Sequence, residues 1–260
     1  MYQLFDYLGA ILTDLKNYKP ELIGLLVGIG SLNLWYLSSV AIDESILPRN
    51  FDYIIRILTV AVGGFIGAYS AFKLQAHQEY QVSLNARKAA LNSALFVLIR
   101  QINAIQCIKR DFDEFNTPLK RALSLPAHEP PNYSDVKQDF KSLEFLIEKG
   151  EPQILLDLTI EQKRFEQTIN SITIRNGFYV DEVQPVLSYH GLNGRYLAMT
   201  EFEEKLGERI FQGAMKGANV MYDHVCASGL SLAKQHKELE LIARKLYPRE
   251  RFIGMKKEGL

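Results

Sequence analysis

A run of 21 residues without a charged side chain, Leu22 to Ile42, most constrains what this chain can form. As an α-helix the run would extend about 30 Å, the thickness of a bilayer's hydrocarbon core. A second uncharged run covers Ile57 to Phe72, and Tyr53 to Arg56 lengthen it to 20 residues. Buried core helices seldom stay uncharged over such lengths. The sequence therefore predicts two transmembrane helices, with Arg56 near an end where its side chain can reach the headgroups.

The flanking charges predict the orientation of this hairpin. Basic residues lie before the first run and after the second, whereas the loop between them is mainly acidic: Lys16, Lys19, Lys73, Arg87 and Lys88 against Asp43, Glu44 and Asp52. The positive-inside rule then places both termini in the cytoplasm. Residues 1–20 form an amphipathic segment without a signal-peptide cleavage site, and we expect it on the membrane surface or on the cytosolic domain.

Small residues recur at the same spacing in both predicted spans: Gly24, Gly28 and Ser31 in the first, Gly63, Gly67 and Ser70 in the second. This spacing lets helix backbones approach closely in a membrane. Either the two helices of one hairpin pack through these faces, or helices of different copies do, which would give an oligomer. Asn33 lies near the middle of the first span, where its amide either bonds a neighbouring helix or lines a polar path.

The rest of the chain has the periodicity of helices. Neither glycine nor proline follows Gly67 until Pro118, and apolar residues recur at three- and four-residue steps: Leu91, Leu95, Leu98, Ile102, Ile105 and Phe112. This spacing is typical of a coiled-coil or bundle seam. We expect the second span, in a hairpin domain of residues 21–75, to continue unbroken through residues 76–117 as one helix of about 60 residues.

Beyond this helix the sequence predicts a proline-rich linker, residues 118–134, and a helical domain with a basic tail, residues 135–260. We expect a helix from Ser134 to Gly150 and another from Pro152 to about Asn176. Thr200 and Glu203 read as a capping box that opens the last long helix, where Gly213 and Gly217 permit close packing on a neighbour. No stretch alternates as a strand does, so the predicted fold class is all-α: an N-terminal two-helix transmembrane hairpin, a long helix and a cytosolic helical bundle.

Motifs that carry chemistry are few. The five histidines are scattered, the two cysteines lie far apart, and no nucleophile, Walker or zinc-protease motif occurs. His190 beside Gly191 is the best acid–base candidate, and it has no identifiable partner. We therefore expect a protein that is not an enzyme and that uses no metal or cofactor.

Charge is balanced over the whole chain, with 30 basic and 30 acidic residues, which argues against a general nucleic-acid binder. The tail is the exception, because six basic residues face only Glu250 there: Arg244, Lys245, Arg249, Arg251, Lys256 and Lys257. Such a patch can contact lipid phosphates or a nucleoprotein partner. The alternative is a solvated basic tail.

This layout resembles the small membrane effectors of bacterial anti-phage systems, and the two-span effectors of retrons in particular. The resemblance lies in the spans Leu22–Ile42 and Tyr53–Phe72 and in the seam Leu91–Phe112. It implies a protein of the bacterial inner membrane, held silent by a cytosolic partner, which in retrons is a reverse transcriptase with its RNA–DNA product. Release would let the effector, as a homo-oligomer, disrupt the membrane in abortive infection. The alternatives are a non-conducting scaffold that recruits a cytosolic complex and an enzyme with its site near His190.

Overall fold

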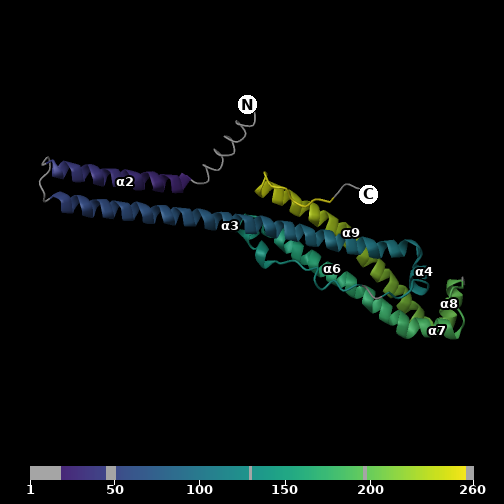
Figure 1. Ribbon diagram of the computed structural model, residues 1–260. Coiled ribbons are helices and arrows are strands. Elements are labelled where there is room, and N and C mark those ends of the chain that lie inside the picture. The colour runs from purple at the N-terminus through teal and green to yellow at the C-terminus, as the bar shows by residue number, and fades with distance from the viewer. Residues whose placement is uncertain (1–18, 45–50, 129–130, 196–197, 256–260) are drawn as a thin grey trace, which may run out of the picture. The chain divides into compact units, whose positions relative to one another are not determined.

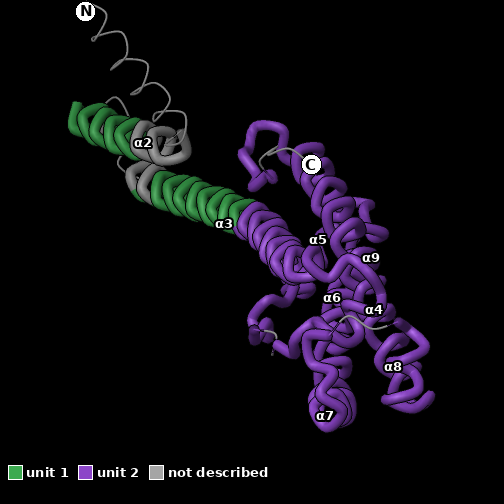
Figure 2. Tube along the Cα trace, turned by 90° about the vertical axis from the view of Figure 1, so that its right-hand side faces the viewer, with its two compact units in different colours: residues 1–85 green, residues 86–260 purple. Residues whose placement is uncertain are grey.

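The computed structural model describes residues 19–44, 51–128, 131–195 and 198–255, and only the backbone of residues 19–27, 31, 42, 51–52 and 55–56. Every regular element in these ranges is a helix, which confirms the all-α fold class. The chain divides into two compact units, Met1–Asn85 and Ala86–Leu260 (Figure 2). Most of the predicted amphipathic segment, residues 1–18, lies outside the described residues.

Helices α2 and α3 supply the described part of the first unit. α2 runs from Lys19 to Asp43 and contains the first uncharged run. α3 runs from Phe51 to Asp113, and its residues as far as Asn85 belong to this unit (Figure 1). The expectation of one unbroken helix from the second apolar run into the bundle seam is therefore confirmed. The pairing of α2 with α3 as a transmembrane hairpin stays a prediction.

Three long helical segments surround the main core of the second unit: residues 86–113 of α3, α6 (Pro152–Phe178) and α9 (Glu208–Leu246). The rings of Phe112 and Tyr222 lie 6.2 Å apart, and Ile105, earlier in α3, packs against Gly229, later in α9. α9 therefore runs antiparallel to α3. Within this unit, Figure 1 shows α6 running in the direction of α3. A short connection between α3 and α6 would make them antiparallel. The long segment from Phe115 to Glu151 allows them to run parallel.

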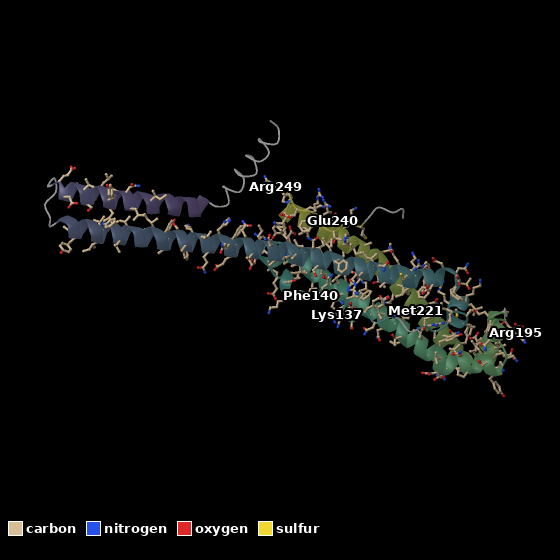
Figure 3. The ribbon with its side chains drawn as sticks, in the orientation of Figure 1. Lys137, Phe140, Arg195, Met221, Glu240 and Arg249 are labelled. Atoms are coloured by element: carbon tan, nitrogen blue, oxygen red, sulfur yellow. The ribbon has the colours of Figure 1, made fainter. Side chains whose placement is uncertain are left out.

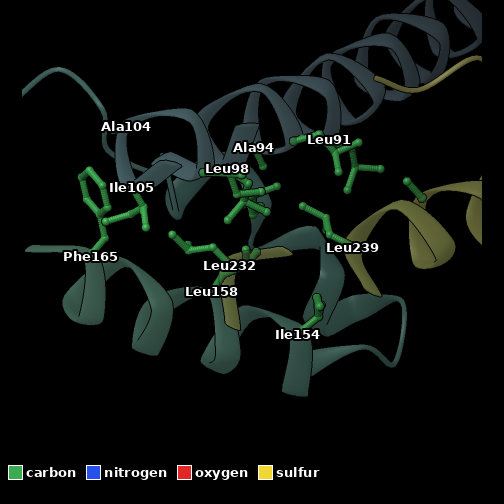
Figure 4. Close-up of a cluster of buried hydrophobic side chains, with 14 of the residues drawn as sticks. Leu91, Ala94, Leu98, Ala104, Ile105, Ile154, Leu158, Phe165, Leu232 and Leu239 are labelled. Carbon is green, nitrogen blue, oxygen red and sulfur yellow. The ribbon is translucent and has the colours of Figure 1, made fainter. Parts of the chain in front are cut away.

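The core side chains come from all three segments (Figure 4). The predicted seam of α3 is buried throughout: Leu91, Leu95, Leu98, Ile102, Ile105 and Phe112. Ile154, Leu158, Phe165 and Ile172 of α6 meet it, as do Leu232 and Leu239 of α9. Each fully buried side chain of this size contributes about 1.5–3 kcal/mol relative to exposure. Unit 2 therefore has a packed apolar core of its own.

A second apolar cluster lies where the first turns of α9 meet four short elements: α4 (Pro118–Leu123), the π-helical turn η2 (Tyr179–Val183), α7 (Gln184–Tyr189) and α8 (Met199–Leu206). Phe211, Ala214 and Ala218 of α9 are buried in it. Because α9 is 39 residues long, one helix contributes to both clusters.

Residues 118–134 were expected to be a linker, and the first six of them form the short helix α4. The hydroxyl of Thr117 accepts the backbone N–H of Lys120 at 3.2 Å, and Pro118 occupies the first turn of α4. A threonine N-cap followed by proline is a favourable helix start, so the proline begins an element here. Ala122 and Leu123 are buried in the second cluster.

The helix expected from Ser134 to Gly150 is present only as two short pieces, Lys141–Leu143 and α5 (Phe145–Glu148). Before them the chain is held by buried glutamines. The backbone N–H of Gln138 donates to Oε1 of Gln162 at 3.3 Å, and Nε2 of Gln101 donates to the carbonyl of Val136 at 3.3 Å. These bonds replace the helical ones, which explains the departure from the prediction. Val136 and Leu143 are buried, whereas Ile147 is exposed.

The predicted capping box is also wrong in its position. α8 begins at Met199, and the carboxylate of Glu201 accepts the backbone N–H of Ala198 at 3.2 Å. Thr200 therefore lies inside α8. The last helical region is then interrupted at Gly207, whose φ of 74° is strained for any residue with a side chain. α9 starts at the next residue and ends before Pro248, as predicted.

Candidate functional site

The first part of α3 is the strongest functional feature of the chain. Of the described helices, this one is long and apolar enough to cross a membrane, and no side chain of its most apolar stretch is buried. Val60 and Phe65 expose 75% and 74% of their surface, while Leu91 and Leu98 further along the same helix expose 0% and 1%. A water-soluble helix rarely presents a long apolar surface on all sides. By length and composition this stretch is a candidate membrane span.

Aromatic residues lie near both ends of the apolar stretch. Tyr53 precedes it and is exposed, and Tyr69 near its end is exposed as well. The Nζ atom of Lys73 lies 5.6 Å from the ring centroid of Tyr69. Sixteen residues separate the two tyrosines in sequence, which is about 24 Å of helix. Tyrosine and lysine at such positions are typical of the membrane–water interface.

The predicted small-residue faces are open in the single chain. Among the described atoms, none lies within 4 Å of the position that a Cβ would take at Gly28, Gly63 or Gly67. Ser70 is half-buried. The surroundings of Gly24 and Ser31 lie outside the described residues. The described glycines therefore leave room for another helix to approach the backbone.

Asn33 and Arg56 are the polar residues predicted within the spans. Asn33 is exposed, and its Nδ2 donates to the carbonyl of Ile29 at 3.0 Å, one turn back in α2. This bond satisfies part of the amide within its own helix. Arg56 lies in the second turn of α3, and its side chain lies outside the described residues.

The C-terminal segment is anchored to unit 2 and is not a free tail up to Met255. Phe252 is buried in the main core, and its ring lies 6.4 Å from that of Tyr247. The backbone N–H of Ile253 donates to Oδ1 of Asn92 in α3 at 3.1 Å. Lys88 of α3 pairs with Glu250 at 2.6 Å. The chain thus folds back to the end of the unit where α3 enters it.

Two of the six residues of the predicted basic patch form ion pairs with carboxylates, one of them distant in sequence and the other one turn away. Arg244 pairs with Glu240, and Lys245 pairs with Glu151, both at 2.7 Å. Figure 3 shows Glu240 and Arg249 at one end of unit 2, with Arg195 at the other. Arg249 and Arg251 are exposed and have no ion pair within the described residues. Lys256 and Lys257 lie outside those residues. Within the described residues, Arg249 and Arg251 are therefore the patch residues that are open to a phosphate or a partner.

The candidate enzyme chemistry gains no support from geometry. No group of three histidine, cysteine or acidic side chains lies close enough to hold a metal among the described residues. His190 is exposed at the end of α7, with its ring edge-on to Tyr189 at 5.0 Å. Cys107 and Cys226 are free thiols.

Buried polar groups are the feature of unit 2 that the sequence reasoning missed. The most notable is Arg175 of α6, which is 3% exposed and pairs with no carboxylate in the described chain. Its Nη2 donates to the carbonyls of Arg121 and Leu125 at 2.9 and 2.7 Å, at and just beyond the end of α4. Burial lowers the pKa of Arg175 to about 10, so it stays charged at neutral pH. A helical wheel could have identified it, because it follows the apolar Ile172 by three positions and so lies on the same face of α6.

His236 of α9 is a second buried group that the sequence reasoning missed. Its side chain is 0% exposed, and neither ring nitrogen has a hydrogen-bond partner in the described part of the chain. Burial lowers the pKa of His236, and the nearby Glu240 opposes this shift. The fold therefore holds this imidazole in its neutral form.

The free energy of unfolding of unit 2 should decrease as the pH is lowered beyond about 6.5, which is the pKa of histidine in an unfolded chain. There the unfolded chain binds a proton that folded His236 does not, so the free energy of unfolding decreases by up to about 1.4 kcal/mol per pH unit. His236→Leu should remove this part of the pH dependence in thermal unfolding followed by circular dichroism from pH 5 to 8. The exposed His190→Leu is the control. An unchanged pH slope in His236→Leu would contradict the assignment.

Comparison with protein-family models, curated proteins and solved structures finds no match for this chain. Its function must therefore be argued from its own residues and geometry.

Proposed function

We propose that this chain is a membrane effector of a bacterial anti-phage system of the kind its layout resembles. A hairpin of α2 and the apolar part of α3 anchors it in the inner membrane, with both termini in the cytoplasm. Unit 2 binds a cytosolic protein or nucleoprotein partner, in a retron a reverse transcriptase with its RNA–DNA product, which holds the effector inactive. On release, the spans of several copies associate and permeabilise the membrane.

One observation carries the proposal: α3 is a single helix with two different environments. Its apolar stretch has no buried side chain, while its seam from Leu91 to Phe112 is buried in a water-soluble bundle. One continuous helix thus supplies both the candidate membrane span and a part of the folded bundle. A change in the surroundings of unit 2 can therefore act directly on the membrane segment.

Two further observations support the mode of action. The described glycines of the spans are open to close approach by a second helix, which the association of copies requires. Arg249 and Arg251 are exposed and free of ion pairs in the described chain, and a phosphate-rich partner would supply their counter-charge.

The test is expression of the full chain in bacteria with membrane potential measured by a voltage-sensitive dye, together with survival. Expressed alone, the protein should depolarise the cells within the induction period, and co-expression with its genomic neighbours should suppress this. Unchanged potential in both cases would overturn the effector proposal and favour the non-conducting scaffold, which is harmless without its client.

A matched pair of variants shows whether the depolarisation requires α3 in the membrane. Val62 and Val82 are both exposed valines of α3, but only Val62 lies in the apolar stretch. Arginine near the middle of a span costs about 3 kcal/mol of insertion free energy. Val62→Arg should therefore reduce both membrane fractionation and depolarisation, whereas Val82→Arg should change neither.

A further inference from the structure

A cavity of about 180 Å³ lies between the end of α6, the π-helical turn η2, α4 and the first turns of α9. Its walls include Ala122 of α4, Phe178 of α6, Val183 of η2 and Ala214 of α9. Ile174 lines it and is 65% exposed, so the cavity has an opening at the surface. None of the membrane features described above involves this place.

The cavity exists because α9 presents no large side chain to it. At Gly213 the absence of a side chain is required, since a Cβ there would lie 2.7 Å from Cζ of Phe178. At Gly217 it is not required, because the nearest atom to a Cβ would be Cγ of Arg175 at an ordinary 3.9 Å. Packing alone would therefore accept a larger residue at Gly217. Leaving the space unfilled reduces stability, and this cost is recovered if something else occupies it.

The chemistry of the walls defines the occupant. The two polar side chains of the lining, Arg175 and Tyr179, already donate hydrogen bonds to backbone carbonyls of residues 121–125. The Tyr179 hydroxyl donates to the carbonyl of Leu123 at 3.2 Å. The remaining walls are hydrocarbon or aromatic. An apolar space of this size has room for an uncharged molecule about as large as one aromatic ring.

We propose that this cavity is a binding site for a small uncharged apolar molecule, an aromatic ring or a short hydrocarbon. The π-helical turn Tyr179–Val183 forms one wall, and such turns are frequent at ligand sites in helical proteins. A bound molecule would contact α4, α6 and α9 together and so stabilise unit 2 by mass action.

The experiment measures thermal unfolding of the full chain in nanodiscs with and without benzene as the probe. At ten times its Kd, benzene should raise the unfolding midpoint of unit 2 by about 3 to 6 °C. Gly217→Leu fills the cavity with its own side chain, so its midpoint should equal or exceed that of the unaltered protein and should not respond to benzene. Benzene dissolved in the lipid acts on both proteins equally, so the difference between them reports the cavity.

Gly217→Ala keeps the test decisive if the leucine variant does not fold. Its methyl group takes part of the space without a close contact, so it should fold and show a smaller shift. Gly177→Ala is the control, because Gly177 is exposed with no atom within 4 Å of a Cβ, and it should keep the full shift. Equal benzene shifts in all variants, or no shift in the unaltered protein, would overturn the proposal. Either outcome is independent of the depolarisation assay.

Discussion

Replacing both Gly63 and Gly67 with leucine should abolish depolarisation and restore the survival of cells that express the chain alone. The two glycines lie one turn apart on α3, and space is open beside both in the described chain. Leucine side chains there would keep a second helix from approaching the backbone. Every 1.4 kcal/mol lost from association lowers its equilibrium constant about tenfold, so the loss of two close contacts should exceed what higher expression can offset.

The direction of this substitution makes the result specific. Leucine is more apolar than glycine, and glycine weakens a helix, so the variant should insert into the membrane at least as well as the unaltered protein. A loss of activity therefore cannot be attributed to failed insertion. Membrane fractionation and immunoblotting would confirm equal amounts of both proteins.

The matched control uses the opposite side of the same helix. Ala61 and Ala68 are exposed and lie about 140–160° around the helix from Gly63. Ala61→Leu with Ala68→Leu adds the same kind of bulk and should leave depolarisation intact. If instead the glycine variant remained as toxic as the unaltered protein, close packing through this face would have no part in the mechanism.

The sequence predicted the parts of the fold that depend on spacing along one helix. The apolar stretch of α3 follows from a hydrophobic run, and the buried seam from Leu91 to Phe112 follows from three- and four-residue steps. The unbroken helix through residue 113 followed from the absence of glycine and proline after Gly67. Such features are local, so the identity of a distant partner does not affect them.

The elements that were predicted wrongly depend on distant residues. Residues 134–140 are not helical because their backbone is bonded by Gln101 and Gln162, which lie on other elements. Phe252 joins the core through a segment whose anchor, Asn92, is 161 residues away in sequence. A basic run reads as a solvated tail unless the carboxylates that neutralise it are known. Glu151, the partner of Lys245, is the residue before the first turn of α6, far from the basic run in sequence.

Arg175→Met should strongly destabilise unit 2. The guanidinium is fully enclosed, and its Nη2 accounts for three bonds, to the carbonyls of Arg121, Ala122 and Leu125. Methionine fills a similar volume but donates nothing, so these carbonyls would lose their charged donor. Hydrogen bonds to a charged group are worth about 1.5–3 kcal/mol each, and leaving buried acceptors unpaired adds a desolvation penalty. We expect a loss of about 3 kcal/mol or more.

This loss should appear as a fall of about 6 to 12 °C in the unfolding midpoint of unit 2, measured by circular dichroism on the full chain. Arg209→Met is the matched control. Arg209 also lies near the second cluster and pairs with Glu182 at 2.7 Å, but its side chain is 71% exposed. Exposed ion pairs contribute at most about 1 kcal/mol, so that variant should shift the midpoint little.

Arg175→Lys separates the roles of charge and of the planar donor group. Lysine keeps the positive charge near the carbonyl end of α4, but its ammonium is shorter and cannot reproduce the guanidinium's geometry. A midpoint between those of Arg175→Met and the unaltered protein would show that charge and geometry both hold α4 to α6. If Arg175→Met had the same unfolding midpoint as the unaltered protein, the hydrogen bonds of Arg175 would contribute nothing to holding α4. The apolar packing of Ala122 and Leu123 alone would then hold it.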